Sequence, residues 1–347
     1  MLSICSKITG TQRYLSFDEK WSWKVNSNNY LLGGSDHNSI EPLFRIHGIE
    51  IPELIEKKYR IMAKELNLES PNYAQLIGNK FKTKLVNTTE DVYANIKRLE
   101  SHRYTKFYFE TNKWLWTLTG APIDIIRYNS IKKSHNISDI QHDGKNIIPI
   151  RYDRSKIKTG RLSVIQGPPI TTMNSDWRNI AKNCRQIDFS SMEPMFLLNV
   201  SGQKIKGDLY EWVASNANLK GDRSYTKIAI ISSLYGSARQ IPAVTKLFAL
   251  DEWEKQLEAN VSNGIIENYY GRPIQCQDIK GRHLLSLWLQ SSAADAAIKG
   301  FSSFFENNKN LNPHWLIHDA CIFSGNGTLP DKIIIDDMNF PIKSGAV

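Results

Sequence analysis

The chain has 347 residues, of which 41% are hydrophobic, so it can bury a substantial core and form two or three subdomains. Its 44 Lys and Arg against 35 Asp and Glu give a net charge of +9, which favours a polyanionic partner without requiring nucleic acid. No apolar run approaches the about 18 residues of a membrane span, and the four cysteines are widely spaced, so we expect no membrane segment, zinc module or disulfide framework.

The N-terminal third is expected to be mostly helical. Residues 1–45 are polar with aromatic clusters, and no pattern in them indicates a function. Residues 51–66 have apolar side chains at helical spacing, and residues 70–120 continue as helix. The wet side of the first helix is either a solvated face or a contact to a phosphate backbone. Its cations are Lys57, Lys58, Arg60 and Lys64. Residues 125–155, rich in Asn, Ser, Asp and Gly, predict a loop or hairpin.

A short strand followed by a helix is predicted at residues 185–202. The apolar run RQIDF places Asp188 at the end of the strand, a polar turn follows, and an amphipathic helix begins near Glu193. Because aspartate commonly caps the helix that comes next in the chain, Asp188 taken alone requires no chemistry.

Two later stretches supply partners for Asp188. A helix is predicted over residues 223–239, with a stripe of side chains four residues apart: Arg223, Lys227, Ile231 and Tyr235. Residues 314–323 predict a strand, a tight turn and a strand, with His318 and Asp319 at the tip. Two carboxylates on strands and a cationic helix suit phosphoryl transfer with two divalent ions, because the metals need hard oxygen ligands and a triphosphate needs positive charge.

These three stretches, in this order, resemble the A, B and C motifs of family A DNA polymerases, the bacterial DNA polymerase I type. TGRLS at residues 159–163 is similar to an upstream signature of that family, and Arg282 with QSSAAD at residues 290–295 is similar to a later one. A weaker similarity to the entry into the family's thumb runs from HGIEI through LNLESPNYAQLI. The resemblance covers residues 45–347, is strongest from 159 to 323, and indicates a compact, phage-like member without an exonuclease domain.

The resemblance implies an α+β chain with the right-hand polymerase fold, in which an antiparallel palm sheet carries helical thumb and fingers. The implied regions are an N-terminal segment of unknown role at 1–45, a thumb-like helical region at 46–155, a palm at 156–202 and 265–347, and fingers at 203–264. The intervals between the motifs are shorter than is typical of the family, so the fingers are expected to be reduced.

The resemblance also assigns the metal and phosphate sites. Asp188 and Asp319, with the backbone carbonyl of Phe189, would hold two Mg²⁺ ions, for which Mn²⁺ could substitute. Lys227 would neutralise the triphosphate and protonate the leaving pyrophosphate, and Arg223 would hold the outer phosphates.

Three further residues of the implied dNTP site are Glu193, Ile231 and Tyr235. In the family, a glutamate at the place of Glu193 excludes a ribose 2′-hydroxyl and so selects deoxynucleotides. An ordinary first-turn glutamate interacting with the helix dipole would look the same, and both can hold. Ile231 departs from the Phe or Tyr that is usual there, facing the incoming sugar and base, so the family's usual nucleotide packing cannot be assumed for this chain.

The residues implied in primer-template binding are Arg161, Arg282, Gln290 and His318. Arg161 is expected to read minor-groove acceptors, which are present at every base pair. Arg282 and Gln290 fall on one helix face with Ser286, where the family usually has Asn. Ala320 replaces an acidic residue that many relatives carry after the motif C aspartate, so a secondary carboxylate is missing.

The function implied is a template-directed DNA polymerase that adds dNTPs to a primer 3′-hydroxyl by two-metal nucleotidyl transfer. Residues 1–45 are too few for a proofreading domain, so we expect no 3′–5′ exonuclease in this chain. One alternative is a single-subunit RNA polymerase, which Glu193 opposes because those enzymes carry a glycine there. The other is a catalytically degenerate polymerase fold acting as a DNA-binding replisome module. Ile231 and Ala320 favour that module, whereas the two aspartates and Lys227 oppose it.

The expected partners are primer-template DNA and dNTPs, together with a separate helicase, primase or nuclease. No membrane partner is expected. Cysteines without a pairing pattern suit a reducing cytoplasm, which would be the host cytoplasm for a phage-encoded protein.

Overall fold

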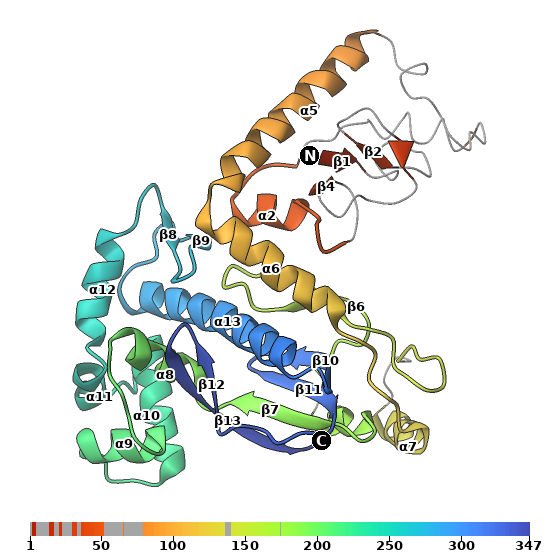
Figure 1. The fold of residues 1–347 in the computed structure, drawn as a ribbon. Coiled ribbons are helices and arrows are strands. Elements are labelled where there is room, and N and C mark those ends of the chain that lie inside the picture. The colour runs from red at the N-terminus through yellow and green to blue at the C-terminus, as the bar shows by residue number, and fades with distance from the viewer. Residues whose placement is uncertain are drawn as a thin grey trace. The chain divides into compact units, whose positions relative to one another are not determined.

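The computed structural model describes residues 2–4, 14–16, 21–22, 30–32, 36–51, 65, 79–135, 140–173 and 175–347 (Figure 1). The chain divides into two compact units, Met1–Trp116 and Thr117–Val347. The cations of the predicted helix at 51–66 lie outside the described residues. Among the helices that are described, none is long and apolar enough to cross a membrane.

The first unit combines a small sheet with helices. Its four strands have the order β3-β2-β1-β4. They are β1 (Leu2–Ile4), β2 (Tyr14–Ser16), β3 (Trp21–Ser22) and β4 (Tyr30–Leu32), and the helices are α2 (Glu41–Ile46), α5 (Asn79–Glu100) and α6 (Arg103–Thr117). α5 and α6 confirm the helical prediction for 79–117. The Asn112 amide of α6 donates to the His37 carbonyl at 2.8 Å, which ties α6 to the segment after β4.

A helix stands where the sequence predicted a loop. α7 spans Ile125–His135, so the prediction for 125–155 was wrong over this part. The Asp124 carboxylate accepts from the Arg127 backbone N–H at 3.0 Å and caps the helix, and the buried Tyr128 packs edge-on against Trp177. The helix cap and the burial of the Tyr128 ring favour a helix here more than the polar composition favours a loop. Residues 142–147 do form the expected tight turn, with a bridge between His142 and Ile147.

The second unit is built on a five-stranded antiparallel sheet with the order β10-β11-β7-β13-β12. The strands are β7 (Arg185–Phe189), β10 (Leu311–Ile317), β11 (Ala320–Gly325), β12 (Lys332–Ile335) and β13 (Met338–Ala346). Helices mixed with antiparallel sheets confirm the α+β class, while the right-hand arrangement stays a prediction.

One long helix, α13 (Gly281–Asn307), covers one face of this sheet together with α8 (Met192–Val200) (Figure 1). The Phe189 ring lies 4.7 Å from the Phe301 ring of α13, and a Cβ at Gly300 would come within 3.0 Å of the Phe189 ring. Phe189 therefore points into the core beneath α13. Because side chains alternate along a strand, Asp188 points to the opposite, open face.

The remaining elements flank the sheet. Two hairpins pair β5 (Arg151–Asp153) with β6 (Ser163–Gln166), and β8 (Ile265–Glu267) with β9 (Pro273–Gln275). A 3₁₀ helix, η1, spans Ser175–Ile180. Helices fill most of the stretch between α8 and β8: α9 (Leu209–Asn216), α10 (Arg223–Tyr235), α11 (Pro242–Leu247) and α12 (Leu250–Ala259). This is the range predicted as reduced fingers.

A buried ion pair anchors the segment that leads into residues 159–163. The Arg154 guanidinium lies 2.5 Å from the Asp295 carboxylate of α13, and both side chains are 0% exposed. The Asn268 amide donates to the same carboxylate at 2.8 Å, and Arg272 donates to the Arg154 carbonyl at 2.8 Å. These contacts fix the chain just before Arg161 against α13 and the β8-β9 turn.

Candidate active site

The two predicted carboxylates come from neighbouring strands. Asp188 on β7 is the register partner of Ala320 on β11, and the Phe189 N–H donates to the Asp319 carbonyl at 3.0 Å. β10 and β11 form the predicted strand, turn and strand, with His318 in the left-handed region at φ 57°. Asp188 and Asp319 therefore lie side by side, and both line a cavity of about 300 Å³.

Burial and mutual repulsion disfavour the charged forms of these aspartates. Burial, and then the negative charge of Asp319, raise the pKa of Asp188 to about 6, although Lys343, Arg178 and Lys227 oppose the shift. Burial is also the main cause that raises the pKa of Asp319, with a contribution from Glu193. A cation placed between the two carboxylates would relieve this repulsion.

The donor set fits a hard divalent ion held jointly with a substrate. Within the described residues, no cluster of three or more His, Cys, Asp or Glu side chains could form a complete metal cage. Mg²⁺ commonly needs only one or two protein carboxylates, and takes water and phosphate oxygens for the rest. Ala320, opposite Asp188, is buried and supplies no oxygen from its side chain, as the sequence indicated.

Because burial and charge repulsion destabilise the ionised form of Asp188, we expect Asp188→Asn to raise the free energy of unfolding in a pH-dependent way. The folded wild type takes up a proton at Asp188 near pH 6, whereas the unfolded chain does so near pH 4. The wild type therefore loses stability as the pH rises from about 4 to about 6, and the variant avoids this loss. In EDTA we expect the variant to be more stable by about 1 kcal/mol at about pH 7.5, after allowance for solvent screening at a half-buried group, and equal at about pH 4.

Urea unfolding of both proteins at the two pH values measures this difference. Adding Mg²⁺ at the higher pH should stabilise the wild type more than the variant, because only the wild type keeps both carboxylates. A wild type that is the more stable protein at the higher pH in EDTA would contradict the repulsion argued above.

Helix α10 supplies positive charge on another wall of the same cavity. The Asp222 carboxylate caps α10 by accepting from the Tyr225 N–H at 2.7 Å. The cap starts the helix so that Arg223, Lys227 and Ile231 all line the cavity of Asp188. Ile231 is 44% exposed and presents an apolar surface to this space.

Arg223 is held in place by its neighbours. Its guanidinium lies 2.9 Å from the Asp208 carboxylate and 4.2 Å above the centre of the Tyr210 ring. Asp208 also caps α9, and the Tyr210 hydroxyl accepts from Ser191 at 2.7 Å. The contacts with Asp208 and Tyr210 thus orient the Arg223 side chain where it lines the cavity.

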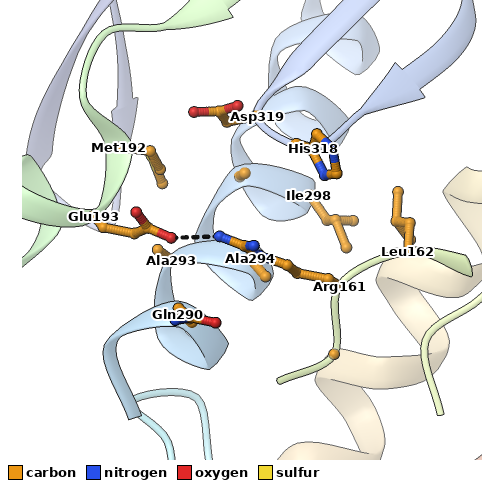
Figure 2. Close-up of a pocket in the computed structure, with 12 residues that line it drawn as sticks. Arg161, Leu162, Met192, Glu193, Gln290, Ala293, Ala294, Ile298, His318 and Asp319 are labelled. Carbon is orange, nitrogen blue, oxygen red and sulfur yellow. Dashed lines mark hydrogen bonds and ion pairs between the residues drawn. The ribbon is translucent and has the colours of Figure 1, made fainter. Parts of the chain in front are cut away.

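A second cavity of about 80 Å³ adjoins the first, and Met192, Glu193 and Asp319 line both (Figure 2). In Figure 2, Arg161 reaches across the smaller cavity to Glu193, and their ion pair measures 2.6 Å. Gln290 on α13 and His318 at the strand turn complete its polar lining. Glu193 therefore stands at the boundary between the two spaces.

Tyr235 also belongs to this boundary, although it lines neither cavity. Burial, and then the nearby Glu193 carboxylate, raise the pKa of its hydroxyl. A hydrogen bond with Gln290 acts in the opposite direction. Tyr235 consequently connects the end of α10 to the polar wall of the smaller cavity.

The structure brings together most of the residues predicted for the site. The larger cavity is lined by Asp188, Phe189, Glu193, Arg223, Lys227, Ile231 and Asp319. The smaller is lined by Arg161, Glu193, Gln290, His318 and Asp319. Arg282 lines neither cavity, and its side chain instead contacts α12 and the end of α10.

Tyr210 and Lys343 are among the residues of the larger cavity that the sequence did not predict. Lys343 on β13 is the register partner of Asp188, on the side of β7 opposite Ala320. No local pattern marks Lys343, because its position depends on how the last strand pairs with β7. A weak signal existed for Tyr210, since Asp208 in the sequence DLYE is a typical helix cap that fixes the start of α9.

No protein-family model matches the sequence, and no curated protein matches it. Among solved structures, one described as the POL domain of Pol1 from M. smegmatis in complex with DNA primer-template and dNTP is similar to this chain, with a TM-score of 0.41 and 16% sequence identity. The similarity covers 88% of this chain and 62% of that one, so the chain spans less than two thirds of its neighbour's length.

Proposed function

We propose that this chain is a template-directed DNA polymerase of the family A type, which adds dNTPs to a primer 3′-hydroxyl by nucleotidyl transfer. One observation carries the proposal: Asp188 and Asp319 share a cavity of about 300 Å³ with Arg223 and Lys227. Paired carboxylates and nearby cations are the complementary halves of a site for a metal-bound triphosphate.

The carboxylates of Asp188 and Asp319 and the carbonyl of Phe189 would hold two Mg²⁺ ions, or Mn²⁺ in their place. When bound, such ions lower the pKa of a hydroxyl nucleophile and offset the charge of a triphosphate. The raised pKa of Asp188 supports this use. It means that the charged carboxylate is destabilised in the protein, and a nearby cation would stabilise that charged form.

The cations of α10 would bind the phosphates of the incoming nucleotide. Arg223, fixed by Asp208 and Tyr210, would hold the outer phosphates with its planar guanidinium. Lys227, further along the same wall, would neutralise the charge that develops on the leaving group, and its Nζ would donate a proton to the pyrophosphate oxygen. Base-pair shape beneath α10 would select the nucleotide that matches the template.

The smaller cavity would receive the end of the primer-template duplex. Arg161, Gln290 and His318 line it as hydrogen-bonding groups next to Asp319, so a primer 3′-hydroxyl bound there would be close to the carboxylates. Glu193 at the boundary would meet the sugar of the incoming nucleotide and exclude a 2′-hydroxyl. Its ion pair with Arg161 would hold it in that position.

Extension of a labelled DNA primer on a DNA template tests the proposal, with Mg²⁺ and with dNTPs or rNTPs supplied separately. We expect extension with dNTPs and none with rNTPs. The double variant Asp188→Ala, Asp319→Ala should extend nothing. The control Asp331→Ala, which removes an exposed carboxylate outside both cavities, should extend as the wild type does.

Other outcomes would replace the proposal. Equal extension with rNTPs would overturn the role of Glu193 and favour an RNA polymerase. Well-folded wild-type protein that binds the duplex and extends nothing would favour a DNA-binding replisome module. Extension that survives in the double variant would exclude Asp188 and Asp319 as the metal site.

A further inference from the structure

Arg282, in the first turn of α13, is surrounded by intramolecular partners. Its Nε contacts the Glu254 carboxylate, its Nη1 donates to the Ser233 carbonyl, and its Nη2 lies 3.1 Å from the Asp251 carboxylate. The side chain is 11% exposed. Each of its three nitrogens is therefore engaged, and two carboxylates compensate its single charge.

The carboxylates belong to one acidic face of α12, on which Asp251, Glu254 and Glu258 follow each other at helical spacing. The Glu258 carboxylate accepts from the Gly281 backbone N–H at 2.7 Å. Acidic side chains at a helix start satisfy its free N–H groups and complement its dipole. The acidic face of α12 thus binds the N-terminal end of α13 through the Gly281 N–H and the Arg282 guanidinium.

The same arginine reaches the C-terminal end of α10. The Ser233 carbonyl lies in the last turn of α10, where carbonyls lack partners within the helix, and the Arg282 guanidinium supplies one. α10 ends at Gly236 with φ 72°, and a Cβ added there would come 2.9 Å from Cβ and Cγ of Arg282. Glycine at this position lets the end of α10 pack directly on the stem of Arg282.

We infer that Arg282 is a positioning residue that fixes α10 over the active-site cavity. The inference rests on the proposed function. Lys227 precedes Ser233 by roughly 9 Å along the helix axis, so a tilt of α10 at its anchored end would displace the phosphate-binding side chain. Ser233, Asp251, Glu254, Gly236 and Arg282 together form what we call the α10 clasp.

This role competes with the contact to primer-template DNA that the family resemblance implies for Arg282. A phosphate or base contact would require the guanidinium to leave two carboxylates and a carbonyl within the protein. Losing those contacts would strand Glu254, a half-buried carboxylate, without its cation. The neighbour Lys280 is exposed, its side chain has no ion pair within the part of the chain that the structure describes, and it serves as the control for loss of charge.

Three variants separate the two roles: Arg282→Met, Arg282→Lys and the pair Asp251→Asn, Glu254→Gln. With Arg282→Met, we expect kcat/KM for dNTP addition to fall about 10–100-fold, because a small misplacement of Lys227 is costly. The Kd for duplex DNA, from fluorescence anisotropy, should match that of the control Lys280→Met. Backbone amides near Ser233 should exchange hydrogen faster in Arg282→Met than in the wild type and the control.

The conservative and carboxylate variants sharpen the test. Arg282→Lys should keep most of the defect, because an ammonium cannot make the three contacts of the guanidinium. The carboxylate pair should reproduce the defect, and adding Arg282→Met to it should cost little more, since the residues act as one unit.

The opposite pattern would overturn the inference. Weaker duplex binding in Arg282→Met with a shallower salt dependence, rescue by Arg282→Lys and normal activity in the carboxylate pair would make Arg282 a DNA contact. If the wild type extends no primer, the proposed function fails and hydrogen exchange alone decides the clasp. If the hydrogen exchange of amides near Ser233 is then the same in Arg282→Met as in the wild type, Arg282 does not hold α10 in place.

Discussion

Replacing either Asp188 or Asp319 by Asn is expected to lower the rate of nucleotide addition by about 10³-fold or more. The amide keeps the shape of the side chain but removes the charge that would hold Mg²⁺ next to the primer 3′-hydroxyl. Both residues line the same cavity, and Ala320, which stands opposite Asp188, has no side-chain oxygen that could take the place of either carboxylate. Single-turnover extension at saturating dNTP and Mg²⁺ measures the effect on the chemical step.

The stability of these variants makes the activity test decisive. Asp188→Asn is expected to unfold at higher urea than the wild type without metal, so a loss of its activity cannot be ascribed to unfolding. Asp331→Asn removes an exposed carboxylate elsewhere in the same unit and should extend normally. If both active-site variants retained more than about a tenth of the wild-type rate, the two-metal assignment would be wrong.

The sequence predicts the site where the signal is local. The apolar run before Asp188 and the two runs around His318 and Asp319 are short strands, and the structure has them as β7, β10 and β11. The stripe of side chains four residues apart on α10 is likewise a local property. The helix that carries it begins after the Asp222 cap and ends before Gly236. A strand end or helix face can be read from neighbouring residues, because the backbone geometry of one element determines it.

The sequence fails where a contact joins distant segments. Lys343 lies beside Asp188 only because β13 pairs with β7 in one register, and a shift by one residue would turn it to the other face. Arg282 looks like a free cation on a helix face until α12 folds against it. α7 was mistaken for a loop because the burial of Tyr128 against Trp177 cannot be read from composition.

The largest loss of stability is expected for Asp295→Ala, at about 3–5 kcal/mol. Removing this carboxylate takes from the Arg154 guanidinium, which is 0% exposed, the anion that it contacts at 2.5 Å. It also removes the acceptor of the Asn268 amide in the β8-β9 turn. Urea unfolding should show a large drop in midpoint with an unchanged m-value, because the loss lies in the folded state.

The paired replacement Arg154→Met, Asp295→Leu separates the cost of an unpaired charge from the value of the pair. The two apolar side chains remove both charges of the pair together, so the double variant should be clearly more stable than Asp295→Ala. If the double variant and Asp295→Ala lose the same free energy of unfolding, the ion pair itself contributes that stability. The pair anchors the chain just before Arg161, and the double variant keeps the packing there but loses the directional bonds. Primer extension by a stable double variant should therefore fall if Arg161 needs that anchor, and stay normal if packing alone positions it.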